Sequence, residues 1–282
     1  MDTSKKNILL ISKPFGITSF ALVNRVKHLL NERKAGHMGT LDPMATGLMI
    51  IALGKSTRFI PYIDTNIKRY IIQIQFGIET DTDDITGNII NKKDVALDIH
   101  KIEKVINKFT GTIEQVPPVY SAKKLQGKPL YKYARQGNPV TKPAVKIKIY
   151  KIKIINFKDN RLVLDVISSK GSYMRAIARD LGKALGTFGT LSAITRIAVG
   201  NFQISDATTL ERIKKGDFSK GFLSIRDVIN LPVFIVENAE QFRNGIDIAI
   251  DKVMVKDKEG NFIGIGKIKD NIMHPEKVIN LK

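Results

Sequence analysis

The segment from Gly36 to Gly47 carries the strongest candidate for chemistry in this sequence. It holds one acidic residue, Asp42, which follows two glycines and directly precedes Pro43. Glycine lets the backbone turn sharply or approach a ligand closely, and the proline biases Asp42 toward an extended conformation. This pattern fixes one carboxylate in a defined direction on a loop, where catalytic groups concentrate. The residues alone leave a second interpretation open, in which an Asp-Pro turn only ends a strand.

Other motifs of chemical interest fail on spacing. Gly54-Lys55-Ser56-Thr57 resembles the end of a phosphate-binding loop, but Met49 stands where that loop requires its earlier glycine. Gly264-Ile265-Gly266 lacks the third glycine of a dinucleotide fingerprint, because position 269 is lysine. No two of the four histidines lie three or four residues apart, and the chain has no cysteine. We therefore expect no metal site and no cofactor.

The chain is strongly basic. Its 282 residues include 46 Lys and Arg against 27 Asp and Glu, a formal charge of +19 at pH 7. Such an excess favours a polyanionic partner, most often nucleic acid, although a Lys- and Ile-rich proteome would shift every protein in the same direction. No run approaches the roughly 18 apolar residues of a membrane helix, so we expect no membrane span. The absence of cysteine is compatible with a reducing cytoplasm.

Hydrophobic periodicity predicts the elements that must position Asp42. Residues 33–47 show no period and are expected to form a loop, and residues 111–145, with five prolines, are expected to form an ordered insertion outside the core. The isoleucines change parity between Ile149 and Ile152, which predicts a bulge near Tyr150-Lys151. Strands are expected at 7–11, 48–53, 68–76, 146–157, 161–168 and 192–199, and helices at 19–31, 56–63, 99–109 and 172–185.

The tail differs from the rest of the chain. Leu231-Pro232 is expected to mark a boundary, followed by a short helix at 239–244 and strands at 252–255 and 262–268. About 50 residues remain beyond this boundary. A segment of this size is small for an autonomous core, so we expect it to lean on the main domain.

Sequence blocks in a fixed order extend the pattern around Asp42 over most of residues 8–205. Besides residues 36–60, they are Lys13-Pro14 with Gly16 and Ser19, Lys68-Arg69-Tyr70, Thr80-Asp81-Thr82-Asp83 with Gly87, and residues 115–124, 127–137, 169–175 and 195–200. Together these blocks resemble the tRNA pseudouridine-55 synthase family. Its signature is Gly-His-x-Gly-x-Leu-Asp-Pro-x-Ala-Thr-Gly followed by Leu-Gly-x-x-Thr-Lys/Arg, and all blocks occur in the family's order.

The resemblance implies an α+β fold with two parts. Residues 1–230 would form a pseudouridine synthase catalytic core, a mixed, mostly antiparallel sheet flanked by helices, with 111–145 as a tRNA-binding insertion. Residues 231–282 would form a short PUA-like RNA-binding β module. The implied reaction isomerises a uridine in the T loop of tRNA: the base is flipped out, detached at N1 and rejoined through C5. The compact length resembles the stand-alone bacterial type, which implies a cytoplasmic monomer without protein partner, metal or cofactor.

Two alternative functions stay open. One is a guide-directed synthase subunit that acts on ribosomal RNA, and the other is a non-catalytic RNA-binding or RNA-folding protein. The intact trio of Asp42, Tyr70 and Arg175 argues against the second, because a pure binder has no need of it.

The resemblance also implies roles for single residues. Asp42 would be the essential carboxylate, Arg175 its partner, and Tyr70 a ring that stacks on the uracil with a hydroxyl for proton transfer at C5. His37 would occupy the space left by the flipped base. Tyr173 and Ile194 would line the uracil pocket. Substrate contacts are further expected from Lys13 and from the basic residues Arg33, Lys34, Lys123, Lys124, Lys128, Lys132 and Arg135, which could equally be a solvated face.

Overall fold

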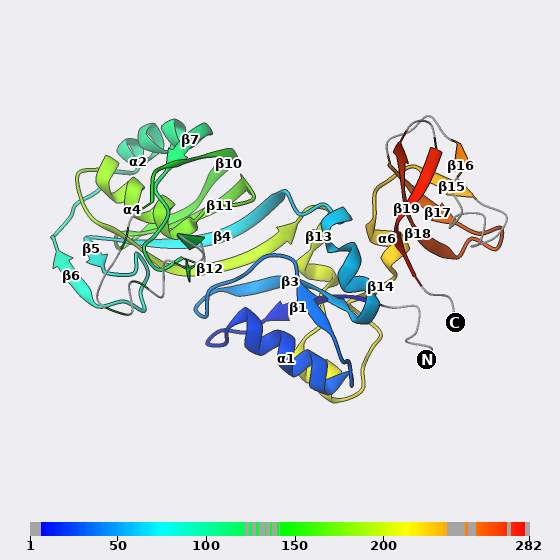
Figure 1. Ribbon diagram of the computed structural model, residues 1–282. Coiled ribbons are helices and arrows are strands. Elements are labelled where there is room, and N and C mark those ends of the chain that lie inside the picture. Colours follow the sequence, from blue (N-terminus) through cyan, green and yellow to red (C-terminus); the bar gives the residue numbers. More distant parts are fainter. Residues whose placement is uncertain are drawn as a thin grey trace.

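The computed structural model of the chain describes residues 7–121, 124–125, 128–129, 133, 136, 140, 142–235, 246–247, 252–269 and 272–279. Figure 1 shows a long twisted sheet that runs through the larger part of the molecule and a smaller sheet at the C-terminal end. None of the helices in these ranges is long and apolar enough to cross a membrane.

Strands from the whole length of the larger part build its sheet. Their bounds are β1 Ile8–Lys13, β2 Ala35–His37, β3 Thr46–Leu53, β4 Ile67–Phe76, β7 Gly111–Gln115, β10 Val145–Lys158, β11 Arg161–Ser169, β12 Gly189–Val199, β13 Phe202–Gln203 and β14 Phe222–Leu223. The order is β14-β1-β3-β12-β4-β11-β10-β7, with β2 beside β3 and β13 beside β12. Within the described residues every neighbouring pair is antiparallel except β3 with β12, which are parallel. The expected mixed, mostly antiparallel sheet is confirmed.

The bulge predicted in the Lys- and Ile-rich strand is present. The pairing of β10 with β11 shifts register between Ile149 and Lys151 and again between Ile154 and Asn156. Ile149 is fully buried on one side of the first shift, and Ile152 packs against the same hydrophobic cluster on the other. The extra residue therefore returns the isoleucines to the core face, which a strict period of two would not allow.

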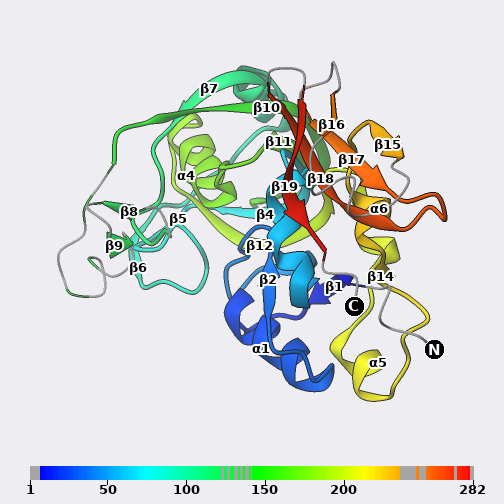
Figure 2. The ribbon, with the colours of Figure 1, turned by 45° about the vertical axis from the view of Figure 1, so that its right-hand side comes forward.

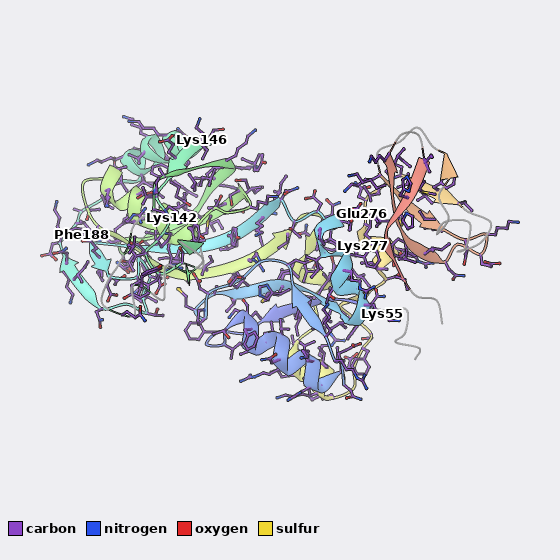
Figure 3. All side chains as sticks on the ribbon, in the orientation of Figure 1. Lys55, Lys142, Lys146, Phe188, Glu276 and Lys277 are labelled. Carbon is purple, nitrogen blue, oxygen red and sulfur yellow. The ribbon has the colours of Figure 1, made fainter. Side chains whose placement is uncertain are left out.

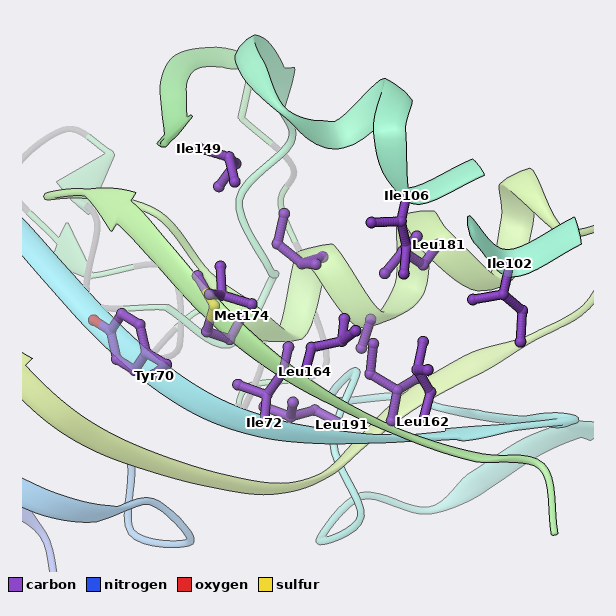
Figure 4. Close-up of a cluster of buried hydrophobic side chains, with 14 of the residues drawn as sticks. Tyr70, Ile72, Ile102, Ile106, Ile149, Leu162, Leu164, Met174, Leu181 and Leu191 are labelled. Carbon is purple, nitrogen blue, oxygen red and sulfur yellow. The ribbon is translucent and has the colours of Figure 1, made fainter. Parts of the chain in front are cut away.

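Helices pack against the sheet in separate hydrophobic clusters. α1 (Ser19–Leu29) begins where the Thr18 side chain accepts a hydrogen bond from the Ala21 amide, and it packs its apolar face on β1 and β3. α2 (Ile99–Ile106) and α4 (Met174–Ala184) share a second cluster on β4, β11 and β12 (Figure 4). The described residues also form α5 Leu210–Lys214, α6 Ile225–Val228 and the 3-10 segments η2 Gly54–Tyr62, η3 Asn107–Phe109 and η4 Ile204–Asp206.

The packing of α4 matters for the site because Arg175 lies in its first turn. Met174, Ile177 and Leu181 recur at helical spacing and are all buried against the sheet. Fully burying one such side chain stabilises a fold by about 1.5–3 kcal/mol. The start of the helix, and Arg175 with it, is therefore held firmly against the sheet.

Two expectations about loops were wrong in part. Residues 33–47 contain a short strand, β2, which pairs with β3 from Ala35 to His37. Residues 111–115 do not belong to an insertion outside the core, because they form β7 at the edge of the main sheet, where Gln115 is buried. Both segments are short and rich in glycine or polar residues, so their pairing depends on a neighbouring strand rather than on their own periodicity. The other expected strands and helices of the larger part are present, with shifted ends.

Two small hairpins stand beside the main sheet. β5 (Ile78–Thr80) pairs with β6 (Ile89–Lys92), and β8 (Lys124–Leu125) pairs with β9 (Lys128–Pro129) within the segment expected as the insertion. Figure 2 shows β5, β6, β8 and β9 together on the side of α4 that lies away from the C-terminal sheet.

The C-terminal sheet has the strand order β15-β17-β18-β19-β16. The bounds are β15 Val233–Ile235, β16 Ile246–Asp247, β17 Lys252–Lys256, β18 Phe262–Lys269 and β19 Ile272–Val278. The sequence predicted β17 and β18 but missed the other three strands, and the expected helix at 239–244 lies outside the described residues.

This small sheet leans on the main domain, as its size requires. Phe262 packs edge-on against Phe59 of η2 with ring centroids 5.2 Å apart, and Met254 and Ile265 join the same cluster. A polar contact adds to it. Glu276 of β19, labelled in Figure 3, acts on the Tyr62 hydroxyl of η2, and the ammonium of Lys252 on β17 lies 5.4 Å from the centroid of the Tyr62 ring. Burial and the neighbouring Glu276 carboxylate raise the pKa of Tyr62 to about 12.

Candidate active site

A pocket of about 220 Å³ opens where the Asp42 loop meets the start of α4. Its walls come from the loop, from β4 and β12, and from the turn before α4. Five of the residues predicted from the sequence line it, namely Asp42, Tyr70, Tyr173, Arg175 and Ile194. Leu41, Ala45 and Leu191 complete its apolar side, and Thr40, Lys68 and Ser121 add polar groups. The pocket thus brings together residues more than 130 positions apart in the chain.

Asp42 and Arg175 form an ion pair at the pocket wall. The Arg175 Nη2 atom lies 2.9 Å from Asp42 Oδ2, and the side chains are 6% and 45% exposed, respectively. Arg175 also donates hydrogen bonds to the carbonyl oxygens of Tyr120 at 2.9 Å and Thr82 at 3.2 Å. The guanidinium is therefore fixed from several sides and buried, unlike the solvated salt bridge that its helix position alone would favour. Asp42, by contrast, is nearly half exposed and lines the pocket.

A second carboxylate, which sequence reasoning missed as a site residue, also holds Arg175. Asp84 Oδ2 lies 3.6 Å from Arg175 Nε, and both side chains are 6% exposed. Asp84 Oδ1 accepts hydrogen bonds from the Thr82 and Thr86 hydroxyls and from the Thr86 amide. The acidic turn at 79–87 was visible in the sequence, but nothing there shows which of its three aspartates turns inward.

Its neighbour Asp83 serves a different arginine. Arg179 Nη1 lies 3.0 Å from Asp83 Oδ2, and Arg179 lies one helical turn beyond Arg175 in α4. Burial raises the pKa of Asp83, and the charges of Arg179 and Arg175 oppose that effect. Two aspartates of the acidic turn, Asp84 and Asp83, therefore clamp the beginning of α4 by pairing with arginines one helical turn apart.

The Asp42 loop is anchored from the N-terminal strand. The Lys13 ammonium donates hydrogen bonds to the carbonyl oxygens of Ile17 at 2.7 Å, Pro14 at 2.9 Å and Pro43 at 3.2 Å. The Ser19 hydroxyl exchanges two hydrogen bonds of 2.8 Å with the Leu41 backbone. These contacts fix the residues on either side of Asp42.

Lys13 does not line the pocket, and its contact with the substrate stays a prediction. Its side chain is fully buried, and its ammonium is occupied by backbone carbonyl oxygens. Burial lowers the pKa of Lys13 to about 8, while the Asp42 charge opposes that shift. Lys13 therefore supports the loop from below.

Tyr70 lies at the end of the hydrophobic cluster beneath α4. Figure 4 shows its ring beside Met174 and its hydroxyl pointing away from the packed isoleucines and leucines. The residue is 7% exposed. Burial raises the pKa of Tyr70, whereas the Arg196 guanidinium opposes that shift. The ring thus packs against the hydrophobic cluster and also lines the pocket, which suits stacking on a planar ligand.

Two basic residues near Tyr70 were not predicted as site residues. Lys68 lines the pocket, and burial together with the Arg196 charge lowers its pKa to about 8. Arg196 is fully buried behind the loop. A signal for both existed in the sequence, because Lys68 lies two residues before Tyr70 and Arg196 two after Ile194, so that each pair shares a face of a strand.

His37 does not line the pocket. It lies on β2 opposite Ile51 of β3, and its Nδ1 atom is enclosed without a hydrogen-bond partner among the described residues. Burial, assisted by the Arg196 charge, lowers the pKa of His37, which favours a neutral ring. Its role beside a flipped base stays a prediction.

The predicted phosphate contacts divide into two groups. Arg33 and Lys34 are exposed just before β2. Lys124 and Lys128 lie on β8 and β9, whereas Lys123, Lys132 and Arg135 lie outside the described residues. All of these contacts with phosphate stay predictions.

Within the described part of the chain, no cluster of three or more His, Asp or Glu side chains is suited to a metal ion.

Comparisons with known proteins agree with this geometry. The family model for the TruB family pseudouridylate synthase (N terminal domain) matches residues 27–174. The "tRNA pseudouridine synthase B" of Caldanaerobacter subterraneus subsp. tengcongensis is 36% identical, over 98% of this chain and 99% of that protein. The proteins of the same name from Clostridium kluyveri and Aquifex aeolicus are 39% and 35% identical, over 93% and 96% of this chain and 96% and 98% of theirs.

Two solved structures show a similar fold. A chain of an H/ACA RNP bound to a substrate RNA containing 2'-deoxyuridine matches with a TM-score of 0.70 at 22% identity, covering 97% of this chain and 85% of that one. A chain of a Cbf5-Nop10-Gar1 complex matches with the same TM-score at 23% identity. At this identity the likeness shows a shared fold. With the family model and the nearly full-length relatives, it follows that the chain belongs to the TruB family of pseudouridylate synthases.

Proposed function

We propose that this chain is a tRNA pseudouridine-55 synthase, which isomerises a uridine in the T loop of tRNA. The observation that carries the proposal is the Asp42–Arg175 pair of 2.9 Å, placed in a pocket that also holds the Tyr70 ring. Relatives that match almost the whole chain are named tRNA pseudouridine synthase B. The formal charge of +19 fits a polyanionic substrate.

The substrate uridine must leave its stack to reach Asp42. Flipping a base out costs a few kcal/mol, which contacts to phosphates and to the shape of the RNA offset. The flipped uracil enters between the Tyr70 ring and the apolar wall made by Leu191 and Ile194. Stacking on the ring replaces the lost stacking in the RNA.

The reaction exchanges one bond for another without redox change. The bond between the ribose C1′ and N1 breaks, the base turns within the pocket, and C1′ bonds to C5. The C5 carbon then loses its proton and N1 gains one, so atoms and electrons balance. The Asp42 carboxylate acts on the nucleoside in the cleavage step, and Arg175, 2.9 Å away, holds that carboxylate in place. Tyr70 supplies the hydroxyl for proton transfer at C5.

We further propose that the protein works as a cytoplasmic monomer without a guide RNA or protein partner. The chain spans 96–99% of the length of three tRNA pseudouridine synthase B relatives, but 85% of the chain from the H/ACA complex. Activity of the purified protein alone on tRNA would therefore separate this function from that of a guide-directed subunit, and light scattering of the active sample would give its oligomeric state.

The test is incubation of the purified protein with an unmodified tRNA transcript, followed by mapping of pseudouridine. We expect pseudouridine at position 55, and Asp42→Asn should lose at least about a hundredfold in rate while tRNA binding survives. Conversion by the Asp42→Asn variant above about 1% of the wild-type rate would remove Asp42 from its role. Binding without conversion by the wild type would instead favour a non-catalytic RNA-binding protein.

A further inference from the structure

Arg196 is a buried cation that has no role in the reaction proposed above. Its side chain is among the largest fully buried ones in the described residues. Among the ion pairs that these residues form, none includes Arg196. Burying a charge without a counter-charge is costly, and an apolar side chain would fill the space with less penalty. A buried arginine at the edge of a reactive pocket therefore calls for an explanation beyond packing.

The Arg196 guanidinium donates hydrogen bonds to the backbone on both sides of Asp42. Arg196 Nη2 donates to the Gly39 carbonyl at 3.0 Å and Nη1 to the Thr40 carbonyl at 3.3 Å, on the side before Asp42. Nε donates to the Leu48 carbonyl at 2.8 Å, on the side after it. The backbone of Arg196 also pairs with Gly47 in the parallel register of β12 and β3. A Cβ at Gly47 would collide with the Arg196 carbonyl oxygen, so only glycine allows this approach.

Arg196 of β12 stands directly opposite Tyr70 of β4 in the register of the two strands, and its guanidinium acts on the Tyr70 hydroxyl. The charged groups that act on this hydroxyl are Arg196 from β12 and Asp42 from the loop. Lys68 lies two residues before Tyr70 on β4, and its ammonium and Arg196 Nη1 both approach Gly39, at 3.2 and 3.4 Å from where a Cβ would stand. One buried residue thus connects the carboxylate loop with the phenol.

We infer that Arg196 is a positioning residue which sets the Tyr70 hydroxyl against the Asp42 loop and stabilises the phenolate that receives the C5 proton. This inference rests on the proposed function. The phenolate takes the proton from C5, and the electron pair of that C–H bond returns to the ring. The phenol later passes its proton to water, and N1 gains one from water. Arg196 thereby supplies the counter-charge that the phenolate needs, and the phenolate supplies the counter-charge that Arg196 lacks.

The electrostatics of the pair agree with this geometry. Burial raises the pKa of Tyr70, and the charge and hydrogen bond of Arg196 oppose that shift. Burial in turn lowers the pKa of Arg196, and Tyr70 opposes that shift. Each group therefore favours the charged form of the other, as expected of a pair that shares a function.

The experiment compares Arg196→Met, Arg196→Lys and Tyr70→Phe on tRNA transcripts that carry protium or deuterium at C5 of the target uridine. If Arg196 serves proton removal, Arg196→Met should slow a single turnover by about tenfold or more, since each pKa unit added to the phenol lowers its ionised fraction tenfold. The C5 isotope effect should increase above that of the wild type. Arg69→Met is the matched control, because Arg69 pairs with Asp165 outside the pocket, and it should leave both quantities unchanged.

A merely structural Arg196 would give a different result. A slower turnover with an unchanged isotope effect in a folded Arg196→Met variant would mean that the residue only holds the Asp42 loop, and it would overturn the inference. Should Arg196→Met fail to fold, Arg196→Lys keeps the charge and most of the volume. Replacing Tyr70 by a more acidic fluorinated tyrosine in that variant should then restore part of the lost rate. Failure of this rescue would count equally against the inference.

These outcomes are distinct from failure of the proposed function. A wild-type protein that forms no pseudouridine in the transcript would refute the function itself. A wild type that converts the transcript, with an isotope effect that Arg196 substitutions leave unchanged, would refute only the role of Arg196.

Discussion

Asp84→Asn gives the sharpest test of how Arg175 is held beside Asp42. The substitution keeps the size of the side chain and removes the negative charge 3.6 Å from Arg175 Nε. The carbonyl oxygen of the introduced amide could still accept hydrogen bonds from the Thr82 and Thr86 hydroxyls. What the variant loses is the second carboxylate that a buried guanidinium faces, so that Asp42 would become the sole acidic partner of Arg175 in the described structure.

The size of the effect follows from these contacts. A hydrogen bond to a charged group contributes about 1.5–3 kcal/mol, and breaking a buried ion pair costs about 3–5 kcal/mol. The lower range applies, because Asp42 and two backbone carbonyls still hold Arg175. We expect the free energy of unfolding to fall by about 1.5–3 kcal/mol, which lowers Tm by about 3–12 °C. A shift of Arg175 that weakens its hold on Asp42 by about 1.4 kcal/mol would slow turnover tenfold.

The adjacent Asp83 provides the matched control. Asp83→Asn removes a carboxylate 3.0 Å from Arg179, whose side chain does not line the pocket. Thermal unfolding and single-turnover conversion of a tRNA transcript would be measured for both variants. Asp84→Asn should lose stability and rate, with tRNA affinity kept within about twofold, whereas Asp83→Asn should lose stability with its rate within about twofold of the wild type. Equal slowing by the two variants would refute the reasoning, because it would show that the clamp on α4 matters and not the charge beside Arg175.

Three further predictions concern cofactors, RNA contacts and pH. Activity on a prefolded minimal T arm should persist in EDTA without added nucleotide, and a total loss that zinc or magnesium restores would contradict the expectation of no cofactor. Replacing Lys123, Lys124 and Lys128 by Ala should reduce the steepness of log affinity against log salt by about 2, at roughly 0.7 per phosphate. The same replacement of the exposed control residues Lys104, Lys108 and Lys158 should leave the slope unchanged. An unchanged slope in the first variant would mean that its three lysines form a solvated face. The pKa of Lys13 falls from 10.5 to about 8 on folding, so the unfolded chain binds more protons between these values and stability should rise with pH across that window. Urea unfolding should show this rise in the wild type and lose it in Lys13→Met, and an identical pH dependence of the two proteins would mean that Lys13 keeps its proton in the fold.

Much of the architecture was predictable because long strands carry their own signal. The parity change between Ile149 and Ile152 predicted a bulge that the pairing of β10 with β11 shows. Short strands carry no such signal. β2 and β7 form because β3 and β10 offer them a free edge, and the short strands β15 and β16 depend in the same way on β17 and β19. Pairing of this kind is a tertiary effect that no local pattern records.

For the pocket, resemblance predicted the central residues, but the burial of the residues that hold them was not predicted. Asp42, Tyr70 and Arg175 were predicted by resemblance, and the structure gathers them around one pocket. The sequence did not predict that the residues holding them are buried, because a charged side chain usually faces water. Lys13 and Arg196 are fully buried, and Asp84 is 6% exposed. Only the fold shows that these side chains turn inward.

The buried charges of Lys13 and Arg196 also determine the electrostatic potential at the pocket. Lys13 and Arg196 surround the Asp42 loop from beneath, and their cationic ends are bound largely by backbone carbonyl oxygens. Such oxygens satisfy the hydrogen bonds of a cation without cancelling its charge, so the positive potential at the loop is retained. Asp42 therefore stands as a single, partly exposed carboxylate over a floor of positive charge. That arrangement leaves the carboxylate accessible at the pocket wall, with cationic groups rather than further anions beneath it.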